Sequence, residues 1–115
     1  MKAGTRASIA YIAAKLSGSN SSHVYDYSNS KFLNFSGSAN SSSVNVYDFD
    51  RSCYITGSPT SLFDYGNSAH IQLSMNGNKF TGYDYDSGNH FSGTIRGNSI
   101  NLYDYETSSF YDYST

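Results

Sequence analysis

The sequence contains no tryptophan, a single cysteine and few charged residues. Without tryptophan, the 12 tyrosines and 7 phenylalanines must supply most of the large apolar contact area. Most of these rings therefore carry a hydroxyl group that needs a hydrogen-bond partner, and surfaces rich in tyrosine remain partly hydrated. Cys53 has no second cysteine to pair with, so the fold forms without an intrachain disulfide, and we expect a buried structural thiol there.

Charge is also scarce, since charged residues make up 14% of the chain and the formal net charge is −2. No basic stripe that could neutralise phosphates is present, so no nucleic-acid partner is expected. No apolar stretch is long enough to cross a bilayer as a helix, so no membrane span is expected. A secretory signal is not favoured at residues 1–17, because Ser8 and Tyr11 interrupt their short apolar stretch, and the localisation is left open.

A triplet of an aromatic residue, aspartate and a second aromatic residue recurs along the chain. Five residues after each triplet comes another aromatic residue or histidine. This constant offset predicts five hairpins, in which the triplet ends one strand, four residues turn, and the next strand begins. The triplets are Tyr25-Asp26-Tyr27, Tyr47-Asp48-Phe49, Phe63-Asp64-Tyr65, Tyr83-Asp84-Tyr85 and Tyr103-Asp104-Tyr105, and the downstream rings are Phe32, Tyr54, His70, His90 and Phe110.

The turns between these strands predict an antiparallel register. A tight two-residue loop within each hairpin would place Tyr65 opposite His70 and Tyr85 opposite His90. About ten short strands are therefore expected between residues 23 and 113. Turns between hairpins are predicted at Asn76-Gly77 and Gly97-Asn98, placing Leu73 against Phe80 and Ile95 against Ile100, and a longer link is predicted from Ser36 to Ser43.

The two-residue period of a strand divides the side chains between two faces. One face is aliphatic and is expected to form the core, whereas the other, the Tyr face, has amide and histidine side chains between its rings. The core face carries Val24, Leu33, Phe35, Val44, Val46, Ile55, Leu62, Ile71, Leu73, Phe80, Phe91, Ile95, Ile100 and Leu102, and the Tyr face carries Tyr25, Tyr27, Phe32, Tyr47, Phe49, Tyr54, Phe63, Tyr65, Tyr83, Tyr85, Tyr103, Tyr105 and Phe110.

The aspartate of each triplet falls on the core side beside a turn, where a charge is costly unless it is hydrogen-bonded. On alternate strands of a meander these carboxylates lie about 10 Å apart, whereas calcium needs several oxygens within about 2.6 Å of one centre. We therefore expect each carboxylate to accept backbone N–H bonds from its own turn or from a helix end, and we predict no metal and no cofactor. The five residues are Asp26, Asp48, Asp64, Asp84 and Asp104.

Residues 1–18 are predicted to form a helix. Thr5 is a plausible N-cap and Gly18 is placed to end the helix. One apolar stripe repeats at helical spacing and needs a surface to cover, which the aliphatic face of the sheet provides; if the sheet rolls up, the helix could close one mouth. The stripe consists of Ile9, Ile12, Ala13 and Leu16.

Together these patterns predict an all-β fold, an antiparallel up-and-down meander of five hairpins that closes into a barrel or curled roll, with the N-terminal helix packed on it. The alternative is an open sheet that pairs with another copy. Residues 1–18 would form the helix and residues 19–115 the tyrosine-rich repeat, within a single domain.

Catalysis is not expected, because the repeat is nearly uniform and offers no asymmetric constellation of reactive groups. We hypothesise a binding module that holds carbohydrate, or a similar polar-apolar ligand, on the Tyr face. The alternative is a structural or self-assembling protein with contacts between copies through the Tyr face or the sheet edges. A third interpretation is a small-ligand cavity inside the rolled sheet. The candidate binding residues are Tyr25, Tyr47, Tyr65, Tyr83, Tyr85, Tyr103, His70 and His90.

Overall fold

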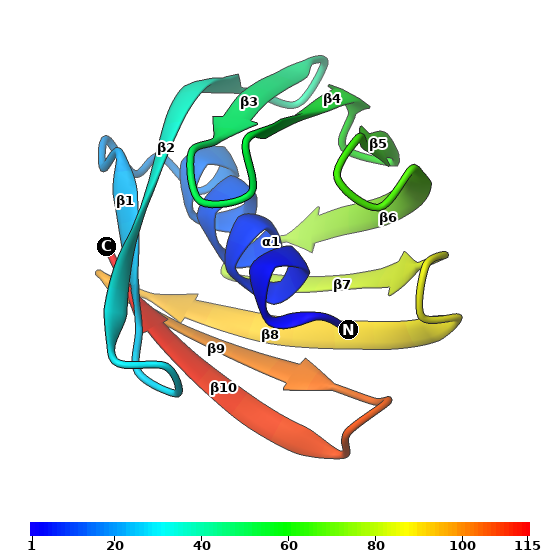
Figure 1. Ribbon diagram of the computed structural model, residues 1–115. Coiled ribbons are helices and arrows are strands. Elements are labelled where there is room, and N and C mark those ends of the chain that lie inside the picture. The colour runs from blue at the N-terminus through cyan, green and yellow to red at the C-terminus, as the bar shows by residue number, and fades with distance from the viewer.

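The computed structural model describes all 115 residues as one helix and ten strands that form a closed antiparallel barrel (Figure 1). Each strand pairs with its neighbours in the chain, and β10 returns to pair with β1. The predicted meander is therefore confirmed, and it closes rather than remaining an open sheet. The elements are α1 (Ala3–Leu16), β1 (His23–Asp26), β2 (Lys31–Ala39), β3 (Val44–Asp48), β4 (Cys53–Ser58), β5 (Ser61–Asp64), β6 (Ala69–Asn76), β7 (Lys79–Asp84), β8 (Asn89–Arg96), β9 (Ser99–Asp104) and β10 (Ser109–Ser114).

The register within the hairpins differs by two residues from the prediction. His90 lies opposite Tyr83 rather than Tyr85, and His70 lies opposite Phe63 rather than Tyr65. The strand ends at the triplet aspartate, because its carboxylate accepts an N–H bond inside a four-residue loop and so stops the ladder there. A two-residue displacement leaves each side chain on its predicted face.

At the other end of the barrel the turns are tighter. Ile95 lies opposite Ile100, as predicted. Leu73 lies opposite Gly82 rather than Phe80, because the turn occupies residues 77–78 and not 76–77. The long link expected after residue 36 was also wrong, since β2 continues to residue 39 and leaves only a short loop before β3.

Helix α1 lies inside the barrel, surrounded by strands (Figure 1). Residues 5–14 are all buried, so the buried surface extends well beyond the predicted stripe. The helix packs on the aliphatic face, as expected, but it runs through the interior rather than closing a mouth. Small side chains at Ala7, Ala10 and Ala14 allow close packing outside the stripe, and the buried polar residues Arg6 and Ser8 are hydrogen-bonded to triplet aspartates.

The ends of α1 are only partly as predicted. The helix begins at Ala3 and is preceded by Lys2, whose side chain makes no capping bond, so Thr5 is not the N-cap. Gly18 ends the helix with a φ of 101°, a left-handed conformation that glycine adopts without strain.

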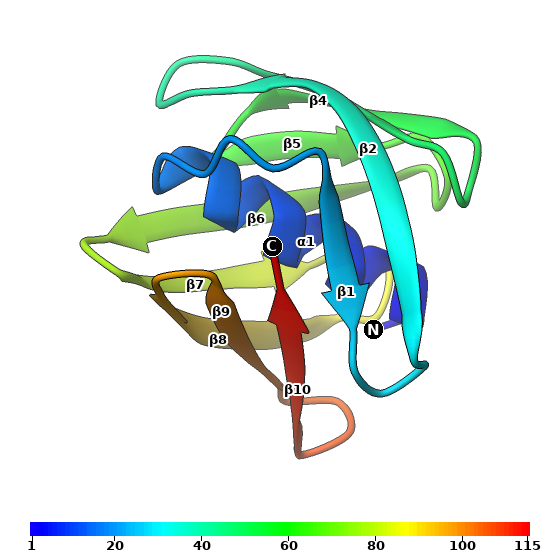
Figure 2. The ribbon, with the colours of Figure 1, turned by 90° about the vertical axis from the view of Figure 1, so that its left-hand side faces the viewer.

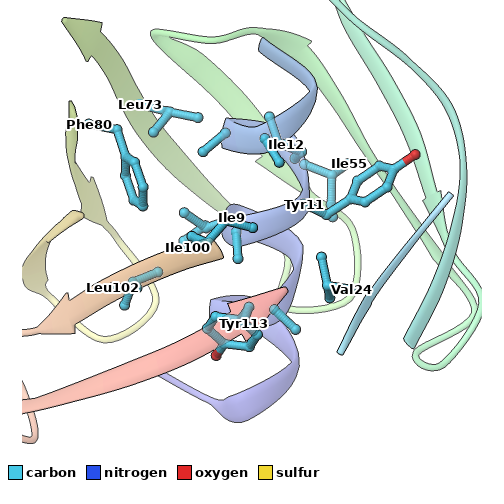
Figure 3. Packing of buried hydrophobic residues seen from close by; sticks show 14 of the residues in the cluster. Ile9, Tyr11, Ile12, Val24, Ile55, Leu73, Phe80, Ile100, Leu102 and Tyr113 are labelled. Carbon is cyan, nitrogen blue, oxygen red and sulfur yellow. The ribbon is translucent and has the colours of Figure 1, made fainter. Parts of the chain in front are cut away.

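The core fills the space between α1 and the strands (Figure 3). Every residue predicted for the core face is buried. On the side of α1 that the predicted stripe left out, the ring of Tyr11 stacks on Phe35 with centroids 4.4 Å apart. Ile9 and Ile12 project from the helix into the same cluster as Leu73 and Phe80. The helix therefore takes the volume that a ten-strand barrel would otherwise leave for a ligand.

Two glycines make room for phenylalanine rings in this core. Gly82 lies opposite Phe91 and Gly93 lies opposite Phe80. A Cβ atom would come within 2.2 Å of the Phe91 ring at position 82 and within 2.1 Å of the Phe80 ring at position 93. Each ring therefore lies over the backbone of its partner glycine.

Candidate functional site

The Tyr face is the outer surface of the barrel, where its rings form five aromatic clusters. In each cluster a central ring is flanked by two others, with centroids 4.7–5.0 Å apart and planes at 63–80°. This edge-to-face arrangement is the favoured geometry for aromatic pairs. The clusters, with the central residue first, are Tyr25 with Tyr27 and Phe32, Tyr47 with Phe49 and Tyr54, Phe63 with Tyr65 and His70, Tyr83 with Tyr85 and His90, and Tyr103 with Tyr105 and Phe110.

Central and flanking rings differ in exposure. The central rings are half-buried by their neighbours, whereas the flanking tyrosine and phenylalanine rings are 52–65% exposed. Each cluster therefore presents two open rings held in place by a third.

The candidate residues do not converge on one pocket. Tyr83, Tyr85 and His90 belong to one cluster, and Tyr65 and His70 meet around Phe63. The remaining three lie in three different clusters. The structure thus distributes the predicted site around the barrel. The three candidates that lie in separate clusters are Tyr25, Tyr47 and Tyr103.

A polar side chain lies beside every central ring, on the neighbouring strand. Gln72 pairs with Tyr83, and Ser92 pairs with Tyr103. Each aromatic cluster is therefore bordered by a group that donates and accepts hydrogen bonds. The other three pairs are Ser36 with Tyr47, Thr56 with Phe63 and Ser114 with Tyr25.

Neither a metal centre nor a spanning helix is part of this arrangement. No group of three or more His, Cys, Asp or Glu side chains is placed to hold a metal ion. No helix combines the length and apolarity needed to cross a membrane.

Comparison with protein-family models, curated proteins and solved structures found no match. Any function must therefore be inferred from the structure of the chain itself. The rings supply apolar area, and the bordering hydroxyl and amide groups supply hydrogen bonds.

The triplet aspartates line the inside of the barrel at the end where α1 begins. Each is at most 1% exposed. One oxygen of each carboxylate accepts the N–H of the residue two positions later, at 2.8–3.1 Å, as predicted. These bonds hold the four-residue loops and identify the aspartates as structural.

The second carboxylate oxygen does not have the same surroundings in every hairpin, and in two hairpins it is bound by one arginine. Arg51 donates to Asp48 at 2.7 Å and to Asp64 at 2.9 Å, and it also donates to the hydroxyl of Ser8 on α1. Burial lowers the pKa of the Arg51 guanidinium, but its bonds to Asp64 and Asp48 outweigh this and raise it. Arg51 thus joins two hairpins to the helix.

Of two further aspartates, one is bound by residues near the N-terminus and the other by a residue of its own turn. Asp104 accepts from the Met1 ammonium at 2.9 Å and from Arg6 at 3.3 Å. Asp26 accepts from the side-chain amide of Asn29 in its own turn at 2.7 Å. The positive end of the α1 dipole also lies at this aspartate-lined end and favours negative charge there.

Asp84 is the exception. Its Oδ2 atom is buried and meets no donor, and the nearby hydroxyl of Ser87 also lacks a partner. Burial raises the pKa of the Asp84 carboxyl above its usual value. Burial likewise raises the pKa of the Cys53 thiol, which is buried as expected.

A groove on the outer surface brings together residues that the sequence interpretation had not combined. It has a volume of about 580 Å³ and lies where β8, β9 and β10 meet the turn after β1. Tyr27, Arg96, Asn101 and Asp112 contribute to its lining. The sequence does carry a signal, because residues 111–113 form a sixth aromatic-Asp-aromatic triplet. In this triplet the two faces are exchanged relative to the other five: the rings of Tyr111 and Tyr113 lie on the inner face, and Asp112 lies on the outer face.

Proposed function

We propose that this protein is a non-enzymatic binding module that holds carbohydrate on its outer aromatic clusters. The observation that carries the proposal is the exposure of the flanking rings, 52–65%, around a barrel whose interior is filled. Exposed apolar surface of this kind is typical of interaction sites. The central ring fixes the flanking rings before a ligand arrives, so binding would cost little side-chain entropy.

The chemistry of the clusters suits a sugar. A pyranose has an apolar face that packs on an aromatic ring and a hydroxylated edge that needs donors and acceptors. Gln72 and Ser92 offer such groups beside Tyr83 and Tyr103. Because the clusters recur around the barrel, a polysaccharide could occupy several at once and gain avidity.

Self-association through the Tyr face is the second candidate. The same exposed rings favour it, since tyrosine is enriched at protein interfaces. In the closed barrel β1 and β10 pair with each other, so no open sheet edge is left for contacts between copies. Self-association would therefore use the Tyr face.

Binding to immobilised neutral polysaccharides and to a glycan array, together with the mass in solution, tests the proposal. We expect a monomer that binds sugar. Replacing Tyr85 and Tyr105 by serine should weaken binding at least about fivefold, since truncating an aromatic anchor typically costs over about 1 kcal/mol. Lys79→Ser, an exposed change on the same face outside the clusters, is the control.

The outcomes separate the two candidates. Self-association would replace carbohydrate binding if the wild type binds no sugar and forms oligomers, and if these oligomers dissociate in the double variant. A monomer that ignores all sugars would refute both.

A further inference from the structure

The pairing between β10 and β1, which lie side by side in Figure 2, is less regular than the pairing between the other strands. At three other junctions, the backbone N–H after a triplet aspartate donates to the carbonyl of a ring residue, as Tyr105 does to His90. Tyr27 donates instead to Asp112, two residues beyond the corresponding ring, Phe110. Only two residue pairs join these strands, whereas other junctions have three to six.

This displacement puts a carboxylate where three other junctions have a tyrosine or histidine. Asp112 is exposed and faces outward beside Tyr27, which is 57% exposed. Its Oδ1 accepts the side-chain amide of Asn101 at 2.8 Å, which orients both groups. The groove described above opens at this point.

Arg96 supplies the opposite charge on the groove wall. It is exposed and forms no ion pair, whereas Arg6 and Arg51 are both paired with buried aspartates. The groove therefore combines an aromatic ring, a carboxylate, an amide and a free guanidinium. These groups can stack on a ring, accept from hydroxyls and donate to hydroxyls or ring oxygens.

We propose that this groove is the primary sugar subsite and takes one neutral pyranose ring. The sugar would pack on Tyr27, with its hydroxyl edge toward Asp112, Asn101 and Arg96. A neutral sugar is favoured over an acidic one, because an added carboxylate would meet Asp112 as well as Arg96. The inference rests on the proposed function and assigns its tightest site.

A similar displacement between β2 and β3 provides an internal control. Phe49 donates its N–H to Asn34 rather than to the ring residue Phe32. The groove beside Phe49 has a volume of about 430 Å³ and contains Asn45, but no charged side chain lines it. Replacing Asn45 in this groove can therefore be compared with replacing Asp112 in the groove between β10 and β1.

Titration with a panel of soluble neutral oligosaccharides, followed by calorimetry, tests the subsite. Asp112→Ala and Arg96→Ala should each weaken binding about tenfold, the usual effect of losing a charge-assisted hydrogen bond. Asn45→Ala should weaken binding less than either of these variants, because no charged side chain lines its groove. Uronic-acid analogues of the best ligand should bind more weakly than the neutral sugar.

The results distinguish failure of the subsite from failure of the proposed function. If the wild type binds and the Tyr85/Tyr105 variant loses binding while Asp112→Ala does not, the subsite is refuted and the function stands. If no oligosaccharide or polysaccharide binds, both are refuted. A preference for the uronic acid, abolished by Arg96→Ala, would overturn the assignment of a neutral ligand.

Discussion

The two faces of the barrel come from one repeat but differ in symmetry. Outside, all five hairpins build nearly the same aromatic cluster, with centroid distances that vary by only 0.3 Å, between 4.7 and 5.0 Å. Inside, the repeated carboxylates have different partners. Asp48 and Asp64 share Arg51, and Asp104 pairs with the ammonium group of Met1. Asp84 has one oxygen without a donor.

The difference arises because a single helix occupies the interior of a five-hairpin repeat. Each hairpin faces a different side of α1, so equivalent aspartates meet different residues, such as Arg6 and Ser8. Outside, every cluster is completed by its own hairpin and needs no partner from elsewhere. Stability should therefore be sensitive to change inside and tolerant of change outside.

The largest effect is expected at Arg51. Arg51→Met leaves the buried carboxylates of Asp48 and Asp64 without their cation, and breaking such a pair typically costs about 3–5 kcal/mol. The free energy of unfolding in urea measures the loss. Arg96→Met, on the outer face and without an ion pair, is the control and should stay within about 0.5 kcal/mol. If both variants lose the same free energy of unfolding, the inner face is no more sensitive to substitution than the outer face.

A smaller loss is expected from filling the space over a glycine. Gly93→Ala places a methyl group 2.1 Å from the Phe80 ring and 2.6 Å from the carbonyl oxygen of Asn101, and overpacking of this kind costs about 1–3 kcal/mol. Adding Phe80→Leu should recover part of the loss, because the shorter side chain can yield. An unchanged melting temperature in Gly93→Ala would show that both the Phe80 ring and the backbone of β9 move aside without cost.

The faces of this fold could be predicted from sequence, but the register and the interior could not. A period of two assigns each side chain to a face and is indifferent to a slip of two residues, which is the error made at Tyr85 and His90. The aspartate before each turn held the missing information, since its carboxylate binds the loop amides and ends the strand early. The outer clusters were predictable because they are local to one hairpin.

The helix and the groove required contacts between distant segments. The spacing of Ile9, Ile12 and Leu16 predicts one buried stripe, yet Leu16 is only partly buried while the small residues on other faces are fully covered. Nothing local shows that a helix of small side chains fits inside ten strands. The groove depends on the displacement between β10 and β1, which brings Tyr27 to Asp112 across most of the chain.

A gain rather than a loss is expected at Ser87. In the first hairpin the equivalent position is Asn29, whose amide donates to Asp26 at 2.7 Å. Ser87→Asn should supply Asp84 with the donor it lacks, raise the free energy of unfolding by about 1 kcal/mol and lower the Asp84 pKa.

The gain at Ser87 should depend on pH. Because burial raises the Asp84 pKa in the folded state, the wild type loses stability as pH rises through that pKa and the buried carboxyl ionises. The added amide helps the charged form, so the gain should be full at about pH 7 and shrink toward about pH 4. A gain that is the same at both values would mean that the asparagine acts elsewhere.

The smallest effect is expected on the outer face, at Tyr105. This ring is 53% exposed and has one aromatic partner, Tyr103, at 4.8 Å. Tyr105→Ser removes a single edge-to-face contact and little buried area, so the free energy of unfolding should fall by about 0.5 kcal/mol, the low end for an aromatic pair. Thermal and urea unfolding of this variant beside Gly93→Ala provide the direct comparison of the two faces. If Tyr105→Ser costs as much as Gly93→Ala, the aromatic clusters stabilise the barrel, and their exposure can no longer be assigned to ligand binding. If it costs little, the fold does not need these exposed rings for its stability, and the result would favour a role in binding, either to a ligand or to a second copy of the chain.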